Sequence, residues 1–291
     1  MKKIFLFFLI AAVTVAACKK KNDSEPGSRV VLKIDRLEDL GPNAQYEGWI
    51  IVNEVPKSTG RFTVNSAGEL SQTTFDVDAS DLNAAKTFVL TVEPMPDPDA
   101  DPSNVKLLAG DFMVNLAEIN TSHPDALGND FTGITSKYLL STPTTASTAD
   151  EKSGVWFIDA ATQTAGLQNL PALPAGWQYE GWAVINGTPV TTGKFSTASG
   201  ADNSAPYSGP MQGPPFPGED FVQSAPAGLT FPTDLTSNKV VISIETVPDN
   251  SSSPFGLKPL DATVPNPSAP MVNYPMNNVA AVSFPAGTVT R

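Results

Sequence analysis

The sequence predicts an all-β fold of two tandem β-sandwich domains that arose by internal duplication. Residues 45–62 and 178–195 share the pattern QYEGW, a short turn and TG-x-F, and are identical at 10 of 18 positions. Short runs of alternating apolar and polar residues, separated by Gly and Pro, recur along the chain, as is typical of sandwiches. Proline contributes 27 of 291 residues, about twice the usual share of roughly 5%, which leaves little room for long helices.

A second pair of matching segments supports the duplication. Residues 88–93 match residues 240–245 at an offset of 152, whereas the first pair is offset by 133. Self-similarity at a fixed spacing indicates a repeated structural unit. The difference between the offsets, 19 residues, predicts an insertion in the second copy.

The first unit is expected over residues 29–129. Residues 46–53 carry apolar side chains on both faces, which predicts a strand covered on two sides. Residues 88–92 place Phe88, Leu90 and Val92 on one face. The remaining expected elements are an opening strand, a short helix and a closing strand, at residues 29–35, 80–86 and 113–119.

The second unit is expected over residues 130–291, after a linker at residues 120–135. It is predicted to begin with a hairpin whose strands are residues 137–141 and 154–159. Residues 179–186, 191–196 and 240–244 repeat the central strands, and an apolar strand at residues 279–284 is expected to close the unit.

The first residues have the layout of an export signal. Lys2 and Lys3 precede an apolar run of 14 residues, which is too short to span a bilayer that needs about 20. The run ends in Val15-Ala16-Ala17-Cys18, which resembles the lipobox of bacterial lipoproteins. The resemblance implies removal of residues 1–17 and a lipid on Cys18, which holds the protein on the cell envelope, with the outer membrane favoured. Residues 18–28 then form the lipidated cysteine and a flexible tether.

Charge and composition exclude several function classes. The formal net charge is −12, and it is −14 without the first 17 residues, which hold two lysines and no acid. Such an acidic body is poorly suited to nucleic acid, and the anchor rather than the surface is expected to supply membrane attachment. With one cysteine and one histidine, a Cys-His or Ser-His nucleophile and a zinc site are not expected. The sequence therefore predicts no enzyme, no cofactor and no metal.

The repeated motif resembles a known family. Tyr-x-x-Trp, a short turn, Thr-Gly-x-Phe and an apolar strand that ends in Glu93 or Glu245 before proline-rich residues are similar to the C-terminal extracytoplasmic domain of anti-sigma-K factors. The resemblance covers residues 45–110 and 178–262, and implies a β-sandwich in the envelope without catalytic residues. The expectation is an anti-sigma-factor-like extracytoplasmic module without a sigma-binding segment.

Three acidic features have alternative interpretations. Glu47 and Glu180 repeat within the motif and are expected to make a structural hydrogen bond or to lie as exposed edge charges, because a catalytic pair would need both in one cleft. Asp97, Asp99 and Asp101 have a spacing that suits calcium, but no downstream glutamate follows in register. A solvated acidic loop is the alternative to a calcium site.

The insertion of the second unit, residues 209–221, is the candidate partner-binding segment. It is rich in proline, which lowers the entropy cost of ordering it on binding. The candidate contact residues are Pro215, Phe216, Glu219, Asp220 and Phe221. The alternative is a loop that folds back over an open end of the sandwich.

Together these features predict a non-catalytic envelope lipoprotein that acts as a binding or sensing module. Its partners are the membrane, through the lipid on Cys18, and an envelope protein or a glycan, and not nucleic acid. The alternative function is a surface accessory lipoprotein that binds glycan beside an outer-membrane transporter, for which an exposed row of tryptophans would be the sign. Trp156, Trp177 and Trp182 are the candidates for that row.

Overall fold

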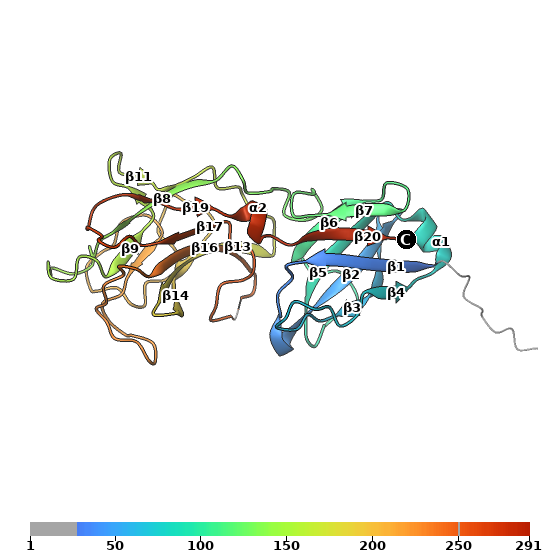
Figure 1. Ribbon diagram of the computed structural model, residues 1–291, viewed down its shortest axis with the longest axis horizontal. Coiled ribbons are helices and arrows are strands. Elements are labelled where there is room, and N and C mark those ends of the chain that lie inside the picture. Colours follow the sequence, from blue (N-terminus) through green and yellow to red (C-terminus); the bar gives the residue numbers. More distant parts are fainter. Residues whose placement is uncertain (1–27, 250) are drawn as a thin grey trace, which may run out of the picture.

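The computed structural model describes residues 28–249 and 251–291. The predicted signal peptide, Cys18 and the tether up to residue 27 lie outside the described residues. The described chain forms two units of facing β-sheets that lie end to end along its long axis (Figure 1). The predicted all-β class is confirmed. Within this described part, no helix is both long enough and apolar enough to cross a membrane.

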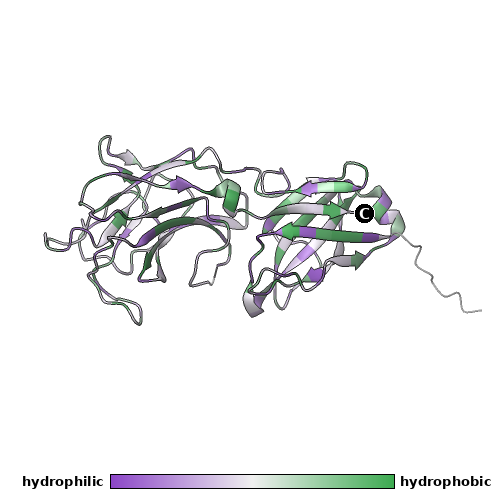
Figure 2. Cartoon of the chain, viewed as in Figure 1, coloured by the Kyte–Doolittle hydropathy of each residue, from purple (hydrophilic) through white to green (hydrophobic). Residues whose placement is uncertain are grey.

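The first unit is a sandwich of two four-stranded antiparallel sheets. One has the order β3-β2-β5-β6, with β3 (Val55–Phe62), β2 (Ala44–Val52), β5 (Thr87–Pro94) and β6 (Lys106–Asp111). The other has the order β4-β1-β20-β7, with β4 (Thr74–Asp76), β1 (Arg29–Asp35), β20 (Ala286–Thr290) and β7 (Leu116–Ile119). In β1, Val30, Leu32 and Ile34 are buried and alternate with exposed residues. Figure 2 shows hydrophobic and hydrophilic residues along the strands of this unit.

The strand β20 corrects the predicted division of the chain. Residues 130–291 were expected to form the second unit, but β20 lies between β1 and β7 in the first one. Val31 pairs with Thr290, and Thr290 also pairs with Leu116. The first unit therefore takes one of the two inner strands of the β4-β1-β20-β7 sheet from a segment that follows the whole second unit in sequence.

The second unit has a five-stranded sheet in the order β14-β13-β16-β17-β19, with β14 (Thr188–Phe195), β13 (Trp177–Ile185), β16 (Lys239–Thr246), β17 (Leu260–Thr263) and β19 (Asn277–Asn278). A second sheet has the order β12-β8-β9-β15, and a further strand, β18, also pairs with β8. Its strands are β12 (Leu167–Gln168), β8 (Thr135–Leu140), β9 (Gly154–Trp156), β15 (Gly218–Asp220) and β18 (Tyr274–Pro275). A small pair, β10 (Ile158–Asp159) and β11 (Thr164–Ala165), lies beside it. The predicted hairpin is present, because β8 pairs with β9.

Helices are few and short. The predicted helix near residues 80–86 is α1 (Ala79–Ala84), which the side chain of Asp78 caps by accepting hydrogen bonds from the backbone N–H groups of Ser80 and Asp81. A 3-10 turn, η1, covers Gly41–Asn43. Residues 279–284 were expected to form a strand, which is wrong: they contain α2 (Ala280–Ser283). Apolar runs this short fit a helix or a strand equally well, and the strand that follows this run, β20, belongs to the first unit.

Four strands of each unit share order and register. Trp49 lies opposite Ser58 in the first unit, and Trp182 lies opposite Thr191 in the second, with a bulge just before each tryptophan. Gly48 and Gly181 precede these bulges, and a Cβ at either would lie within 2.5 Å of a threonine hydroxyl. These shared features agree with the expected repeat, whose origin by duplication stays a prediction.

The two units are joined through packed residues. Buried apolar side chains of both belong to one continuous cluster. At the junction, the rings of Phe131 and Phe284 lie 5.5 Å apart, and the Asn278 amide donates to the backbone carbonyls of Phe131 and Ile134. The expected linker at residues 120–135 is thus partly buried rather than an open connection.

Candidate functional site

A cluster of buried charged groups lies on one face of the β14-β13-β16-β17-β19 sheet of the second unit. Glu180 on β13, Glu245 on β16 and Asp249 after β16 place one oxygen each within 4.8 Å of one another. Lys194 on β14 lies directly opposite Glu180 in the strand register. Because Tyr179 and neighbouring alternate residues fill the sandwich core, Glu180 points to the other face of the sheet.

Hydroxyl and backbone donors compensate the buried carboxylates. Thr191 Oγ1 donates to Glu180 Oε1 at 2.5 Å. Ser243 Oγ donates to Glu245 Oε1, which also accepts from the backbone N–H of Phe255 at 2.9 Å. Lys194 Nζ forms an ion pair with Asp249 Oδ2 at 2.8 Å. A buried carboxylate is costly unless such partners are present.

Burial controls the protonation of this cluster. Desolvation raises the pKa of Glu180 to about 7, against the opposing influence of the hydroxyl of Thr191 and the charge of Lys194. Desolvation likewise raises the pKa of Glu245 to about 7. The cluster therefore changes charge close to neutral pH.

The first unit contains an equivalent cluster at the matching positions of the repeat. Glu47 accepts from Ser58 Oγ at 2.5 Å and from Arg61 Nε at 2.6 Å, and Arg61 Nη2 lies 2.5 Å from Asp97 Oδ2. Glu93 accepts from Thr91 Oγ1 and from the backbone N–H of a residue in the following loop. In both units a tryptophan indole N–H donates to the hydroxyl that itself donates to the glutamate. Trp49 donates to Thr91 at 2.9 Å, and Trp182 donates to Ser243 at 2.8 Å.

The two clusters differ in their cation. The guanidinium of Arg61 contacts both neighbouring carboxylates. The single ammonium of Lys194 contacts Asp249 and lies 3.9 Å from Glu180 Oε2, which has no hydrogen-bond partner in the described structure. The second unit therefore holds a buried carboxylate oxygen that the first unit satisfies.

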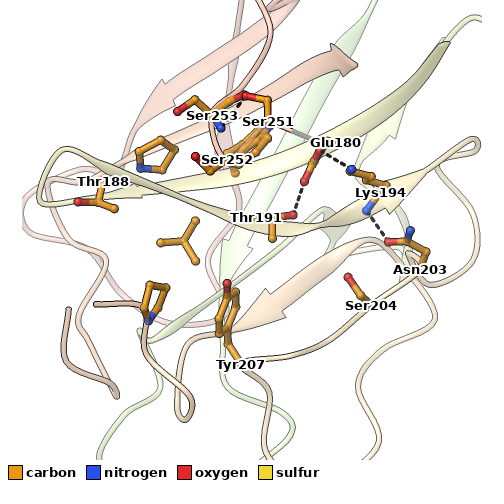
Figure 3. Close-up of a pocket in the computed structure, with 14 residues that line it drawn as sticks. Glu180, Thr188, Thr191, Lys194, Asn203, Ser204, Tyr207, Ser251, Ser252 and Ser253 are labelled. Atoms are coloured by element: carbon orange, nitrogen blue, oxygen red, sulfur yellow. Dashed lines mark hydrogen bonds and ion pairs between the residues drawn. The ribbon is translucent and has the colours of Figure 1, made fainter. Parts of the chain in front are cut away.

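A pocket of about 530 Å³ opens over the second cluster. Figure 3 shows Glu180, Thr191 and Lys194 on one side of it and Tyr207 on another. Much of the remaining wall carries hydroxyl groups, those of Thr188, Ser204, Ser251, Ser252 and Ser253. The wall therefore offers many hydrogen-bond donors and acceptors.

The chemistry of the cluster does not suit a metal ion. Glu180, Glu245 and Asp249 are the only group of three potential ligands that gathers within residues 28–249 and 251–291. Lys194 lies among them as a cation, 2.8 Å from Asp249. A metal ion would have to displace this ammonium group, so the cation position is filled by the protein itself.

The predicted partner-binding residues differ in their exposure to solvent. Glu219, Asp220 and Phe221 are fully buried, which contradicts their predicted place on a binding surface. Pro215 is exposed and Phe216 is half-buried. The end of the insertion, residues 217–221, is therefore a buried segment that contains β15, and the preceding residues 209–216 are exposed or half-buried.

The buried part of the insertion is held by distant residues. Asp220 accepts from the backbone N–H and the hydroxyl of Thr144 at 2.8 and 2.5 Å, and from Trp156 Nε1 at 2.7 Å. Glu219 accepts from the hydroxyl of Ser208. Phe221 packs in the main apolar cluster.

The exposed part of the insertion borders a second pocket of about 430 Å³. Trp156, Met211, Pro215 and Phe216 are among its lining residues. Trp156 itself is buried. All four tryptophans of the chain are at most 6% exposed, so the exposed row that would favour glycan stacking is not found.

Other predicted candidates have structural partners. In the acidic loop, Asp97 pairs with Arg61, and Asp97 and Asp99 accept backbone hydrogen bonds from Asp99 and Asp101. The three side chains do not form a ligand group among the described residues. His123 Nδ1 accepts from the backbone N–H of Asp125 at 3.1 Å within a turn.

The sequence indicated Glu47 and Glu180 as a repeated pair, and Glu93, Glu245 and Asp97 in other contexts, but it did not bring these residues together with Arg61 and Lys194 in the two clusters. Their residues repeat at the two offsets of the matching segments: Arg61 and Lys194 at 133, Asp97 and Asp249 at 152. That repetition of charged residues was a signal available in the sequence.

No protein-family model, curated protein or solved structure matches this chain.

Proposed function

We propose that this protein is a lipid-anchored, non-catalytic binding module of the bacterial envelope, and that its second unit binds a polar group of an envelope protein. The observation that carries this proposal is the pocket of about 530 Å³ over the Glu180–Lys194 cluster. Pockets with a few convergent polar groups are the usual places of ligand recognition. The anti-sigma-K-like motif supports an extracytoplasmic sensing role for such a module.

The contrast between the two clusters favours the second unit as the binding unit. In the first unit, Arg61 satisfies the buried carboxylates. In the second, Lys194 leaves Glu180 Oε2 without a hydrogen bond beneath a pocket lined with hydroxyls. A buried polar atom without a partner is unfavourable, and a ligand that rearranges the Lys194 contacts could relieve it. Binding and stability are thereby linked at one site.

The proposed role is non-catalytic because of where the carboxylates lie. Glu180 is only 2% exposed and Glu245 is 1% exposed. A general acid or base must come within hydrogen-bond reach of its substrate. These two carboxyl groups instead complete a hydrogen-bond network that also occurs in the first unit.

Photocrosslinking tests the pocket. A photoreactive residue is placed at Ser252 on the pocket rim and, as the matched control, at Ala100, which lies 152 positions earlier in the equivalent loop of the first unit. We expect crosslinks to a defined envelope protein from the Ser252 position and none from the Ala100 position. Equal products from both positions would reject the pocket as the binding site.

Labelled fatty acid tests the anchor. Because Val15-Ala16-Ala17-Cys18 resembles a lipobox, the label is expected in the wild-type protein and not in Cys18→Ala. Equal incorporation in both proteins would contradict the proposed anchoring.

Glycan binding is a second candidate, and the hydroxyl-rich wall of the pocket favours it. Sugars are commonly held by hydrogen bonds together with an aromatic platform, and Tyr207 is the aromatic residue in this wall. A glycan array probed with wild type and Tyr207→Ala distinguishes the two: retention of a glycan that the variant loses would favour this candidate.

A further inference from the structure

We infer that the turn between β6 and β7, residues 112–115, together with Leu116 at the start of β7, is a membrane-contact tip that rests on the lipid surface. The inference rests on the proposed anchoring at Cys18 and adds a second point of contact to it. The tip carries the most exposed apolar side chains of the described protein: Val114 is 81% and Met113 is 78% exposed. Leu116, at 41%, extends the same surface.

The tip is a built structure rather than a loose loop. The guanidinium of Arg291 donates to the carbonyl of Val114 through Nε at 3.0 Å and Nη2 at 2.8 Å. Its Nη1 donates to the carbonyls of Leu82 and Ala85 at 2.6 and 2.8 Å, which ties the tip to the end of α1. The same group lies 4.5 Å over the ring of Phe112.

The backbone at the tip is held in an unfavourable conformation. Val114 has a φ of +60°, in the left-handed region that β-branched residues avoid. Such conformations persist where surrounding contacts enforce them, and they cluster at functional sites. The Arg291 contacts enforce this one, and the resulting turn presents Met113 and Val114 outward.

The tip lies at the end of the molecule where the chain leads back to Cys18. β1 begins at Arg29, and β1, β20 and β7 are neighbours in that order. Val31, Thr290 and Leu116 lie across from one another, so the start of β1 and the tip are two strand spacings apart, about 10 Å. Figure 1 shows α1, the start of β1 and the end of β20 at this same end.

The distance to the anchor is short. Cys18 and Ser28 are ten positions apart in the sequence. Ten residues span at most about 35 Å even when fully extended. A lipid on Cys18 would therefore keep this end of the molecule near the bilayer.

Apolar insertion rather than charge accounts for the contact. The protein carries a formal charge of −12, which anionic headgroups would repel. Met113 and Val114 can instead enter the boundary between headgroups and acyl chains, where apolar side chains are stabilised. The tip would then fix the orientation of the protein on the membrane.

A single environment-sensitive dye tests the tip. The chain from residue 18 onward, with Cys18→Ser and Asn115→Cys, is labelled with the dye and tethered by an N-terminal histidine tag to chelating lipid. The vesicles contain phosphatidylethanolamine and phosphatidylglycerol. We expect a blue shift of the dye and protection from a water-soluble quencher. A dye at Thr148→Cys, on a distant exposed loop, is the control and should stay in water.

The outcomes separate the two proposals. Adding Met113→Asp and Val114→Asp should abolish the blue shift while the melting temperature stays close to that of the parent. A tethered protein whose Asn115→Cys dye remains in water overturns the inference, as does an equal shift at Thr148→Cys. A dye shift that appears only at high protein density, and also without vesicles, would indicate contact with a second copy instead. If the shift occurs but Cys18 carries no fatty acid in cells, the tip stands and the anchoring fails.

Discussion

Arg61 and Lys194 hold equivalent carboxylates but offer different donor geometries. The planar guanidinium contacts two carboxylates at 2.6 and 2.5 Å, whereas the ammonium is 2.8 Å from Asp249 and 3.9 Å from Glu180. The pairs lie in the same strand register in both units. The difference in how the two clusters hold their carboxylates therefore follows from the exchange of arginine for lysine at this position.

Exchanging these cations tests the comparison. We expect Lys194→Arg to raise the free energy of unfolding by about 1 kcal/mol, because a guanidinium can add a hydrogen bond to Glu180. The reciprocal Arg61→Lys should lower it. Chemical denaturation measures both changes, and a loss of stability in Lys194→Arg would contradict the argument.

The buried glutamates also predict how stability depends on pH. Burial raises the pKa of Glu180, Glu219 and Glu245 from 4.5 to about 7. Between these values the folded protein binds protons that the unfolded chain has lost. The free energy of unfolding therefore falls as the pH rises from about 4.5 to about 7, and changes little from these groups above that.

Thermal melting in matched buffers checks the direction. The melting temperature should be higher at about pH 5 than at about pH 8. Glu180→Gln and Glu219→Gln should each reduce this difference, because an amide does not titrate. A melting temperature that increases with pH across this window would show that other groups dominate.

The residue-scale prediction from sequence was partly successful. Glu47 and Glu180 were expected to make a structural hydrogen bond or lie exposed, and both are buried and hydrogen-bonded across a hairpin. Their partners Ser58 and Thr191 lie within the same repeated segment. Asp97 and Asp249 come from loops after another strand, and their approach depends on strand register, which residue spacing alone does not specify.

Among the elements, β15 shows why the insertion was misjudged. A proline-rich segment with two phenylalanines has the composition of an exposed recognition loop. Asp220 and Phe221 are nevertheless buried, because Thr144 and Trp156, 76 and 64 positions away, supply donors to Asp220. Those partners cannot be recognised without the fold.

Replacement of residues 209–221 by a short Gly/Ser linker tests the role of this element. We expect a melting temperature well below that of the wild type, because β15, the Asp220 hydrogen bonds and the buried Phe221 are lost together. Phe221→Ala alone should cost roughly 3–5 kcal/mol, the range for truncation of a buried aromatic residue.

The control changes two residues of the insertion that precede the buried segment, the half-buried Pro214 and the exposed Pro215. Pro214→Ser combined with Pro215→Ser leaves β15 intact and should change stability little. If the linker variant has the same melting temperature as the wild type, the segment is dispensable for folding. The prediction of a recognition loop then regains support.

At the scale of the whole molecule, the fold class and the central strands were predictable and the chain path was not. Alternation in residues 29–35 and the repeated motif specify strands locally. The pairing of Val31 with Thr290 joins positions 259 apart, and no local pattern encodes it. The apolar residues 279–284 were expected to close the second unit as a strand, but they contain α2, and the strand that follows them, β20, pairs in the first unit.

A permuted first unit tests this path. Thr290 lies beside Val31, so residues 286–291 can be joined through a short Gly/Ser linker to the start of residues 28–130. We expect this chain to melt cooperatively on its own. Residues 28–130 without β20 should not, because β1 and β7 lose the strand between them. Cooperative melting of both fragments would show that β20 is an accessory strand.

The position of β20 has a consequence for how the chain comes together after synthesis. The first unit is made first, yet it cannot close until the ribosome has produced the entire second unit and then β20. During that interval β1 and β7 present unpaired edges, which are templates for pairing with another chain. A chain interrupted anywhere in the second unit leaves the first one open, so truncated products would be exposed to proteases and chaperones while full-length chains escape them.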